Sequence, residues 1–145
     1  MAEWKKDLDN FFAERARKTP EQQQLEARHA EAAKFFNRAV IPAFEDLGKE
    51  LQKHGRTVRI TPEKDHVSFR VRHKDVEEYR CELRVRIGPR TVVPYVVRHF
   101  FDKKAKRHRR AEVPLREGPK LYTVSDFSKI DLLRFVVGDY KKYVI

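Results

Sequence analysis

The sequence predicts an α+β fold with N-terminal helices, an antiparallel meander sheet of five or six strands, and a C-terminal helix packed on the sheet. Apolar residues recur at helical spacing through residues 1–54, alternate with polar residues through 55–124, and return to helical spacing in 125–145. A chain of 145 residues is the usual size of one domain, and the sequence has no internal repeat and no Gly/Ser linker. We therefore expect the three parts to form a single domain, 1–145.

Two helices are expected before Gly55. The first covers residues 2–18 and has an apolar side made of Trp4, Leu8, Phe11 and Phe12. The second begins at Thr19, where Pro20 and Gln22 complete the pattern of a capping box. Its apolar stripe is Phe36, Val40, Phe44, Leu47 and Leu51. Pro42 should kink this helix near residues 37–41. We expect these aromatic residues to pack in the core or in a dimer interface, and the alternative is a functional role as a ligand box or a partner-binding groove.

Strands are expected wherever the apolar period becomes two. The clearest are residues 67–72 and 79–87, which place their arginines on one face and apolar residues on the other. Polar turn-like links between them favour hairpins between neighbours. Four further strands are expected at residues 56–60, 91–101, 109–115 and 120–124. Pro94 and Pro114 indicate bulges or edge positions, because proline cannot donate to a strand ladder.

The last helix is expected to begin near Phe127, capped by Ser125 or Asp126. Its apolar side would comprise Ile130, Leu133, Val136, Val137 and Tyr140. The apolar face of the sheet needs a cover, and this helix is the nearest candidate in the sequence.

Charge is distributed unevenly along the chain. The formal net charge is +11, with −1 in residues 1–50 and +12 in residues 51–145. Twelve of the eighteen arginines fall between Arg56 and Arg110. A guanidinium group matches two phosphate oxygens at once, so this segment suits a polyanionic partner. A soluble protein can also carry such charge simply to stay in solution.

The candidate site combines a sheet face and a basic run. Aligning the apolar faces of the two clearest strands puts five arginines on one sheet face. Residues 103–110 hold six Lys/Arg residues and one histidine, and they read as the tip of a hairpin over residues 91–115. The candidate nucleic-acid-binding residues are Arg70, Arg72, Arg80, Arg84, Arg86, Lys103, Lys104, Lys106, Arg107, Arg109 and Arg110. Two structural alternatives compete with binding. Acidic residues 21–31 could cover the arginines as an internal ion-pair layer, and the basic run could be a solvated loop.

No catalytic motif, metal-ligand spacing or cofactor-binding loop is recognisable. The six histidines are scattered, and the five glycines form no phosphate loop. Cys81, the only cysteine, lies in an alternating strand pattern and is expected to be a buried thiol. The longest apolar run, residues 92–97, is too short to span a membrane. We expect a cytoplasmic protein that is not an enzyme and that needs no metal and no cofactor.

Two function classes remain. The first is a non-catalytic binding module whose arginine face and hairpin tip contact the phosphates of nucleic acid or of another polyanion. The second is an interaction or adaptor protein that binds an acidic protein, with a homodimer formed through its N-terminal helices. The predominance of arginine on the sheet favours nucleic acid.

Overall fold

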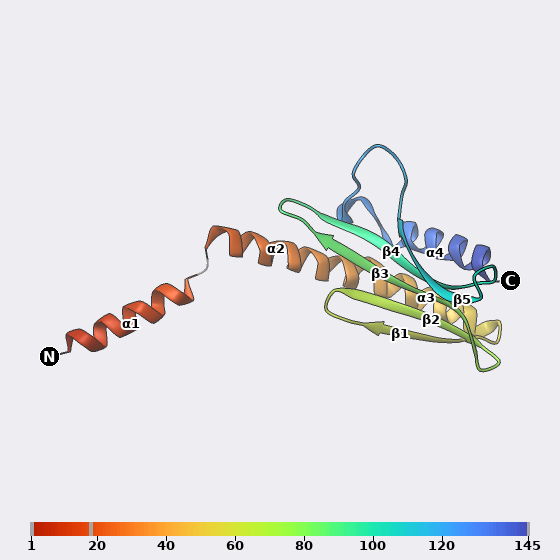
Figure 1. Cartoon of the computed structure of the whole chain (residues 1–145), viewed down its shortest axis with the longest axis horizontal. Helices are drawn as coiled ribbons and strands as arrows, with labels where there is room; N and C mark the ends of the chain where they lie inside the picture. The colour runs from red at the N-terminus through yellow and green to blue at the C-terminus, as the bar shows by residue number, and fades with distance from the viewer. Residues whose placement is uncertain (1, 18, 145) are drawn as a thin grey trace.

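The computed structural model describes residues 2–17 and 19–144 and confirms the α+β class. Three helices precede the sheet, and one follows it: α1 (Glu3–Ala16), α2 (Pro20–Phe35), α3 (Ile41–Lys53) and α4 (Lys129–Tyr143). Two short segments connect these elements, a π-helix (Phe36–Val40) and a 3-10 helix (Val124–Asp126). Helices α3 and α4 lie side by side behind the sheet (Figure 1).

The sheet has five strands in the order of the chain, each antiparallel to its neighbours. They are β1 (Thr57–Pro62), β2 (His66–His73), β3 (Val76–Ile87), β4 (Val92–Asp102) and β5 (Arg107–Pro114). The predicted antiparallel meander is therefore confirmed, with five strands out of the five or six expected.

The entry into the core follows local sequence rules. Thr19 accepts a hydrogen bond from the backbone N–H of Gln22, and the Gln22 side chain accepts one from the backbone N–H of Thr19, as the capping box predicts. Pro42 stands at the second position of α3, directly after the π-helix, so the expected interruption near residues 37–41 is confirmed. Proline lacks the N–H that would continue the regular ladder, and the wider helical turn accommodates this loss.

One apolar core joins the helices to the inner face of the sheet. The predicted stripe of α2 and α3 is buried, from Phe36 to Leu51. It packs against Val67, Phe69 and Val71 of β2 and against Cys81 and Leu83 of β3. The rings of Phe44 and Phe69 stack with centroids 4.7 Å apart. Cys81 is buried as expected, and burial raises the pKa of its thiol to about 12.

Helix α1 departs from the prediction. None of its described residues is buried. The exposed fractions of the four predicted apolar residues lie between 49% and 63%: Trp4, Leu8, Phe11 and Phe12. The helix extends away from the sheet at one end of the molecule (Figure 1). Periodicity showed that these residues share a helix face, but it could not show whether the chain folds back to cover that face.

Residues 120–124 are a second departure, since they form no strand. After β5 the chain leaves the sheet edge and crosses back toward the helices, and this route gives the segment no neighbouring strand. Tyr122 instead packs edge-on against Phe127, at 6.2 Å between ring centroids, and Val124 is buried at the start of the 3-10 helix. A short apolar run can be recruited by the core as a loop when no strand lies beside it.

Helix α4 begins two residues later than predicted and presents a different face. Ser128, rather than Ser125 or Asp126, is the N-cap, and it forms a capping box with Asp131. Its buried residues are Leu132, Val136 and Asp139. Ile130 is 58% exposed, whereas Leu133, Val137 and Tyr140 pack at the margin of the core. Asp139 belongs to the buried face, and a count of apolar residues alone could not include it.

Pro94 and Pro114, expected at bulges or edge positions, occupy permissive positions in β4 and β5. Pro94 pairs with Val85 of β3, but the β4–β5 ladder starts one residue later, at Tyr95 and Pro114. Pro94 therefore has no partner on the β5 side of its strand, and Pro114 stands at the end of the β4–β5 ladder. The irregularity in strand register lies elsewhere, between Val71 and Arg72 of β2.

Candidate nucleic-acid interface

A row of basic side chains crosses the whole sheet on its outer face. Strand register pairs Arg59 with Arg70, Arg70 with Arg80, Arg80 with His99, and His99 with Arg110. Each strand thus contributes one member at directly opposed positions, and we call this set the basic row. Three of its residues were predicted. Arg59 and His99 were missed because cross-strand register across five strands cannot be counted from sequence alone.

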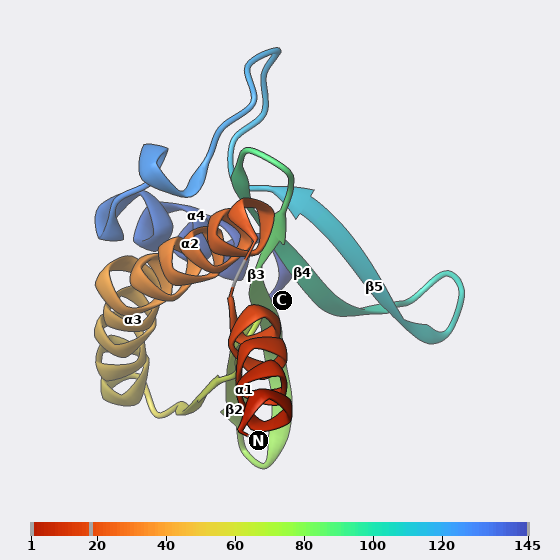
Figure 2. The same ribbon diagram turned by 90° about the vertical axis from the view of Figure 1, so that its left-hand side faces the viewer.

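The helices do not cover this face. Apolar residues of β2 and β3 point to the helix side, and alternation turns the basic row to the opposite side. The acidic residues 21–31 lie on α2, where the buried residues are Ala32 and Phe35. Viewed along the molecule, α2, α3 and α4 gather on one side of the strands (Figure 2). The alternative of an internal ion-pair layer formed with α2 is therefore wrong.

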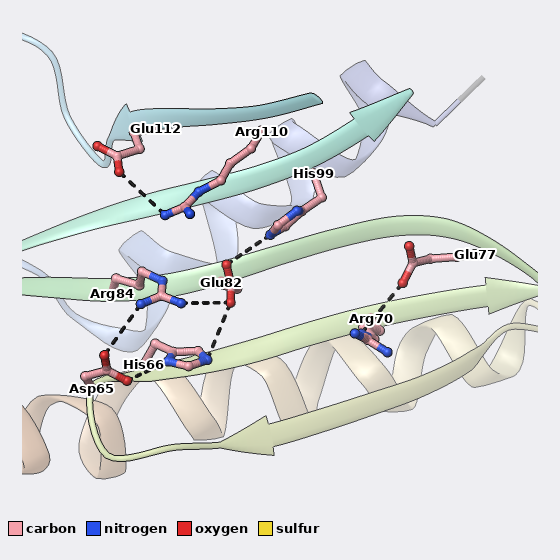
Figure 3. A network of polar contacts seen from close by, with 9 residues as sticks. All are labelled: Asp65, His66, Arg70, Glu77, Glu82, Arg84, His99, Arg110 and Glu112. Carbon is pink, nitrogen blue, oxygen red and sulfur yellow. Dashed lines mark hydrogen bonds and ion pairs between the residues drawn. The ribbon is translucent and has the colours of Figure 1, made fainter. Parts of the chain in front are cut away.

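The acids that balance the face come from the sheet itself. Glu82, in the centre of β3, has a side chain only 10% exposed. It accepts hydrogen bonds from His99 Nε2 at 2.9 Å and Arg84 Nη2 at 3.1 Å, and His66 Nε2 lies 3.5 Å away (Figure 3). Burial alone would raise the pKa of Glu82, but the contacts with His99 and Arg84 outweigh burial and lower this pKa to about 2.

Cations still exceed anions on the strand positions of the outer face. Glu77 lies 3.7 Å from Arg70, and Glu112 pairs with Arg86 and, at 3.6 Å, with Arg110. The arginines at outward strand positions are Arg59, Arg70, Arg72, Arg80, Arg84, Arg86 and Arg110, and the glutamates are Glu77, Glu82 and Glu112. Seven guanidinium groups therefore face three carboxylates.

Two members of the basic row have no acidic partner within the described part of the chain. No ion pair or side-chain hydrogen bond joins Arg59 or Arg80 to residues 2–17 or 19–144. The Nε atoms of Arg80 and Arg84 are buried without a hydrogen-bond partner among these residues. Arg59 is exposed and Arg80 is partly exposed, so the outer N–H groups of their guanidinium groups are available to an external anion.

Aromatic rings accompany the arginines. The guanidinium carbon of Arg86 lies 4.0 Å from the ring centroid of Tyr95. At the other end of β4, Phe101 is 53% exposed, and its ring meets the imidazole of His108 at 5.2 Å between centroids. Exposed rings beside guanidinium groups are surfaces on which unpaired bases can stack.

The basic run forms the tip of the β4–β5 hairpin, and residues 103–110 are all exposed. Asp102 organises the turn, because its Oδ1 accepts from the backbone N–H groups of Lys104 and Ala105. Strand alternation then divides the run. Arg110 joins the outer face, whereas Arg107 and Arg109 point to the inner side, where Arg109 pairs with Asp102 at 3.0 Å. Lys103, Lys104 and Lys106 lie in the turn itself.

A buried ion pair on the other face fastens α4 to the sheet. Asp139 accepts from Arg98 Nε at 3.0 Å and from Arg98 Nη2, and the Tyr79 hydroxyl donates to it at 2.6 Å. The ring of Tyr143 lies 3.8 Å from the Arg98 guanidinium carbon. Arg98 is therefore a structural arginine, and the outer arginines differ from it in exposure and in partners.

Two features are absent from the described part of the chain. Residues 2–17 and 19–144 contain no cluster of histidine, cysteine or acidic side chains arranged to hold a metal ion. Within the same residues no helix is both long and apolar enough to cross a membrane.

Comparison with known proteins gives one partial similarity. No protein-family model matches the chain, and no solved structure matches it. Over 111 residues the chain is 25% identical to a glycine betaine transporter of Acinetobacter baylyi, an alignment that covers 76% of this chain and 16% of the transporter. The chain therefore corresponds to about a sixth of the length of this relative.

Proposed function

We propose that the chain is a non-catalytic module that binds single-stranded nucleic acid through the outer face of its sheet. The observation that carries the proposal is the basic row, with one cationic or imidazole side chain on each of five adjacent strands. Adjacent strands are about 4.8 Å apart, so the row extends over roughly 19 Å. A strand of nucleic acid lying across the sheet would meet an arginine on four strands and the His99 imidazole on the fifth.

Electrostatics supports a partner on this face. Like charges at directly opposed cross-strand positions destabilise a sheet, and Arg59, Arg70 and Arg80 are three such neighbours in succession. A phosphate group between two guanidinium groups converts their repulsion into two charge-assisted attractions. Neutralising several phosphates would also release condensed counterions, which drives binding at low salt.

The exposed ring of Phe101 favours a single strand over a duplex. Phe101 stands on the same face as the basic row, where Tyr95 is a half-buried second ring beneath Arg86. Bases can stack on such rings only when they are unpaired, and stacking contributes about 1 to 3 kcal/mol per base. A duplex would offer phosphates to the arginines but no base to the rings.

Fluorescence anisotropy with three labelled ligands tests the proposal. These are a single-stranded oligonucleotide, the corresponding duplex, and polyglutamate with the same number of charges. We expect the single strand to bind most tightly. Equal affinity for polyglutamate would show that charge alone decides binding, and absence of binding to either nucleic acid at low salt would overturn the proposal.

The second candidate function is an adaptor that binds an acidic protein and dimerises through its N-terminal helices. The exposed apolar side of α1, formed by Trp4, Leu8, Phe11 and Phe12, favours a protein contact. The partial similarity to a glycine betaine transporter fits an attached interaction module, since this chain matches only 16% of that protein. A pull-down that survives nuclease treatment, together with a dimer in analytical ultracentrifugation, would favour this candidate.

A further inference from the structure

The sheet forks at one end. The ladder between β3 and β4 stops at Arg80 and His99, although β3 continues back to Val76 beside β2 and β4 continues to Asp102 beside β5. The β4–β5 hairpin consequently diverges from the β2–β3 hairpin (Figure 2). Between the diverging strand ends lies a cavity of about 440 Å³, which we call the fork cavity. This volume falls within the usual range for small-ligand sites.

Three cations line the fork cavity without an acidic partner in the described part of the chain. They are Arg80 on β3, Lys103 in the hairpin turn and Lys142 near the end of α4. These residues come from three separate elements, so their convergence depends on the tertiary fold. His99 and His108 also contribute to the wall.

The acids of the cavity are already neutralised from outside it. Glu78 accepts two hydrogen bonds of 3.2 Å from Arg56 and a further one from Tyr140, while Glu77 lies 3.7 Å from Arg70. Neither Arg56 nor Arg70 lines the cavity. Their charges cancel the two carboxylates and leave the lining cations free to bind an anion.

Aromatic rings supply a second kind of contact. Phe100, Phe101 and Tyr143 line the same cavity, and Phe100 and Tyr143 lie 6.1 Å apart between ring centroids. Phe101 is more than half exposed, so its face is available. A ligand that suits this lining needs a flat apolar part and a negatively charged part, which is the chemistry of a nucleoside phosphate.

We propose that the fork cavity holds one nucleoside phosphate, with its base against the aromatic wall and its phosphate beside Arg80, Lys103 and Lys142. The inference extends the proposed function, because the cavity continues from the basic row through Arg80 and His99. The ligand would be either one nucleotide of a bound strand or a free nucleotide. Both sources present the same chemistry to the cavity.

The test uses two variants outside the basic row. Lys142 belongs to the cavity proposal alone, so its variant lets the two proposals fail separately, whereas Phe101 also lies on the outer face. Binding of AMP is measured by saturation-transfer NMR, and binding of a single-stranded oligonucleotide by anisotropy. Lys142→Gln is compared with Lys141→Gln, its neighbour on α4 that does not line the cavity. Phe101→Ala is compared with Leu121→Ala, another exposed apolar residue, at 62% exposure.

We expect Lys142→Gln and Phe101→Ala to weaken AMP binding about fivefold or more, and the two control variants to leave it unchanged. Equal weakening of oligonucleotide binding by Lys142→Gln identifies the ligand as a nucleotide of the strand. Binding of AMP without binding of the oligonucleotide supports the cavity site for free nucleotide and overturns the proposed function. If the oligonucleotide binds but Lys142→Gln behaves like Lys141→Gln with both ligands, the cavity inference is overturned and the proposed function stands.

Discussion

Glu82 holds together the polar side chains at the centre of the outer face. Its carboxylate is nearly buried and is bound by side chains from three strands, through His66, Arg84 and His99. These partners keep the carboxylate ionised in the folded protein, so its pKa there is about 2, against an ordinary value of 4.5. A depressed acid pKa stabilises the folded state at every pH above the ordinary value.

Glu82→Gln should therefore lower the free energy of unfolding at pH 7 by about 2 to 3 kcal/mol. The difference between variant and wild type should shrink as the pH falls from about 4.5 to about 2, because the wild-type carboxylate then becomes protonated. Urea unfolding across this pH range measures the effect. A difference that stays constant down to pH 2 would show that the charge of Glu82 contributes nothing.

Asp139 plays the corresponding part on the inner face, where it is buried with Arg98. Asp139→Asn should destabilise the protein by about 3 to 5 kcal/mol, because it leaves the Arg98 guanidinium buried without a counter-charge. Adding Arg98→Met to that variant should restore part of the loss, since the double variant has no unpaired charge. Strictly additive losses in a double-mutant cycle would contradict this coupling.

At the scale of elements, the face that α4 presents to the core is the most informative case. Leu132 is fully buried and Ile130 is 58% exposed, although both are apolar residues in the first turn of the helix. Leu132→Ala should cost about 2 to 5 kcal/mol in unfolding free energy, and Ile130→Ala should change it by less than about 0.5 kcal/mol. Comparable losses in thermal and urea unfolding would mean that the helix packs by the face predicted from sequence.

Variants of the hairpin tip can show whether oligonucleotide binding depends on the position of the side chains or only on their charge. His108 and Arg110 alternate along β5 with Arg107 and Arg109, and only the first two share the outer face. If that face binds nucleic acid, the double change His108→Ser and Arg110→Ser should weaken oligonucleotide binding more than Arg107→Ser and Arg109→Ser. Simple loss of charge predicts the opposite order, because the second variant loses more positive charge. Neither variant should shift the melting temperature appreciably, since exposed charges contribute little to stability.

The strands could be predicted because alternation is a local property, and the five observed strands each overlap a predicted one. The failures have physical causes. Residues 120–124 resemble a strand locally, but the fold places no neighbour beside them. The buried face of α4 contains Asp139, whose partner Arg98 is 41 residues away and cannot be identified from spacing. The fork cavity depends on where one ladder ends, and no periodic pattern marks that position.

At the scale of the whole molecule, the two faces of the sheet carry different kinds of side chain. Apolar packing occupies the inner face under α3 and α4, and excess positive charge occupies the outer face. Helix α1 extends beyond both, with its apolar residues exposed. A binding surface on a rigid sheet backed by a packed core can carry like charges side by side, because the core supplies the stability that their repulsion removes.

The slope of affinity against salt concentration tests the central claim most directly. The variant Arg59→Gln, Arg80→Gln and Arg110→Gln removes three cations of the basic row, and Lys34→Gln, Lys49→Gln and Arg134→Gln removes three exposed cations from the helices. For a single-stranded oligonucleotide, each lost phosphate contact should flatten the plot of log affinity against log salt by about 0.7. We expect the row variant to flatten by about 2 and the helix variant to match the wild type. Equal slopes for the two variants would contradict the outer sheet face as the binding surface.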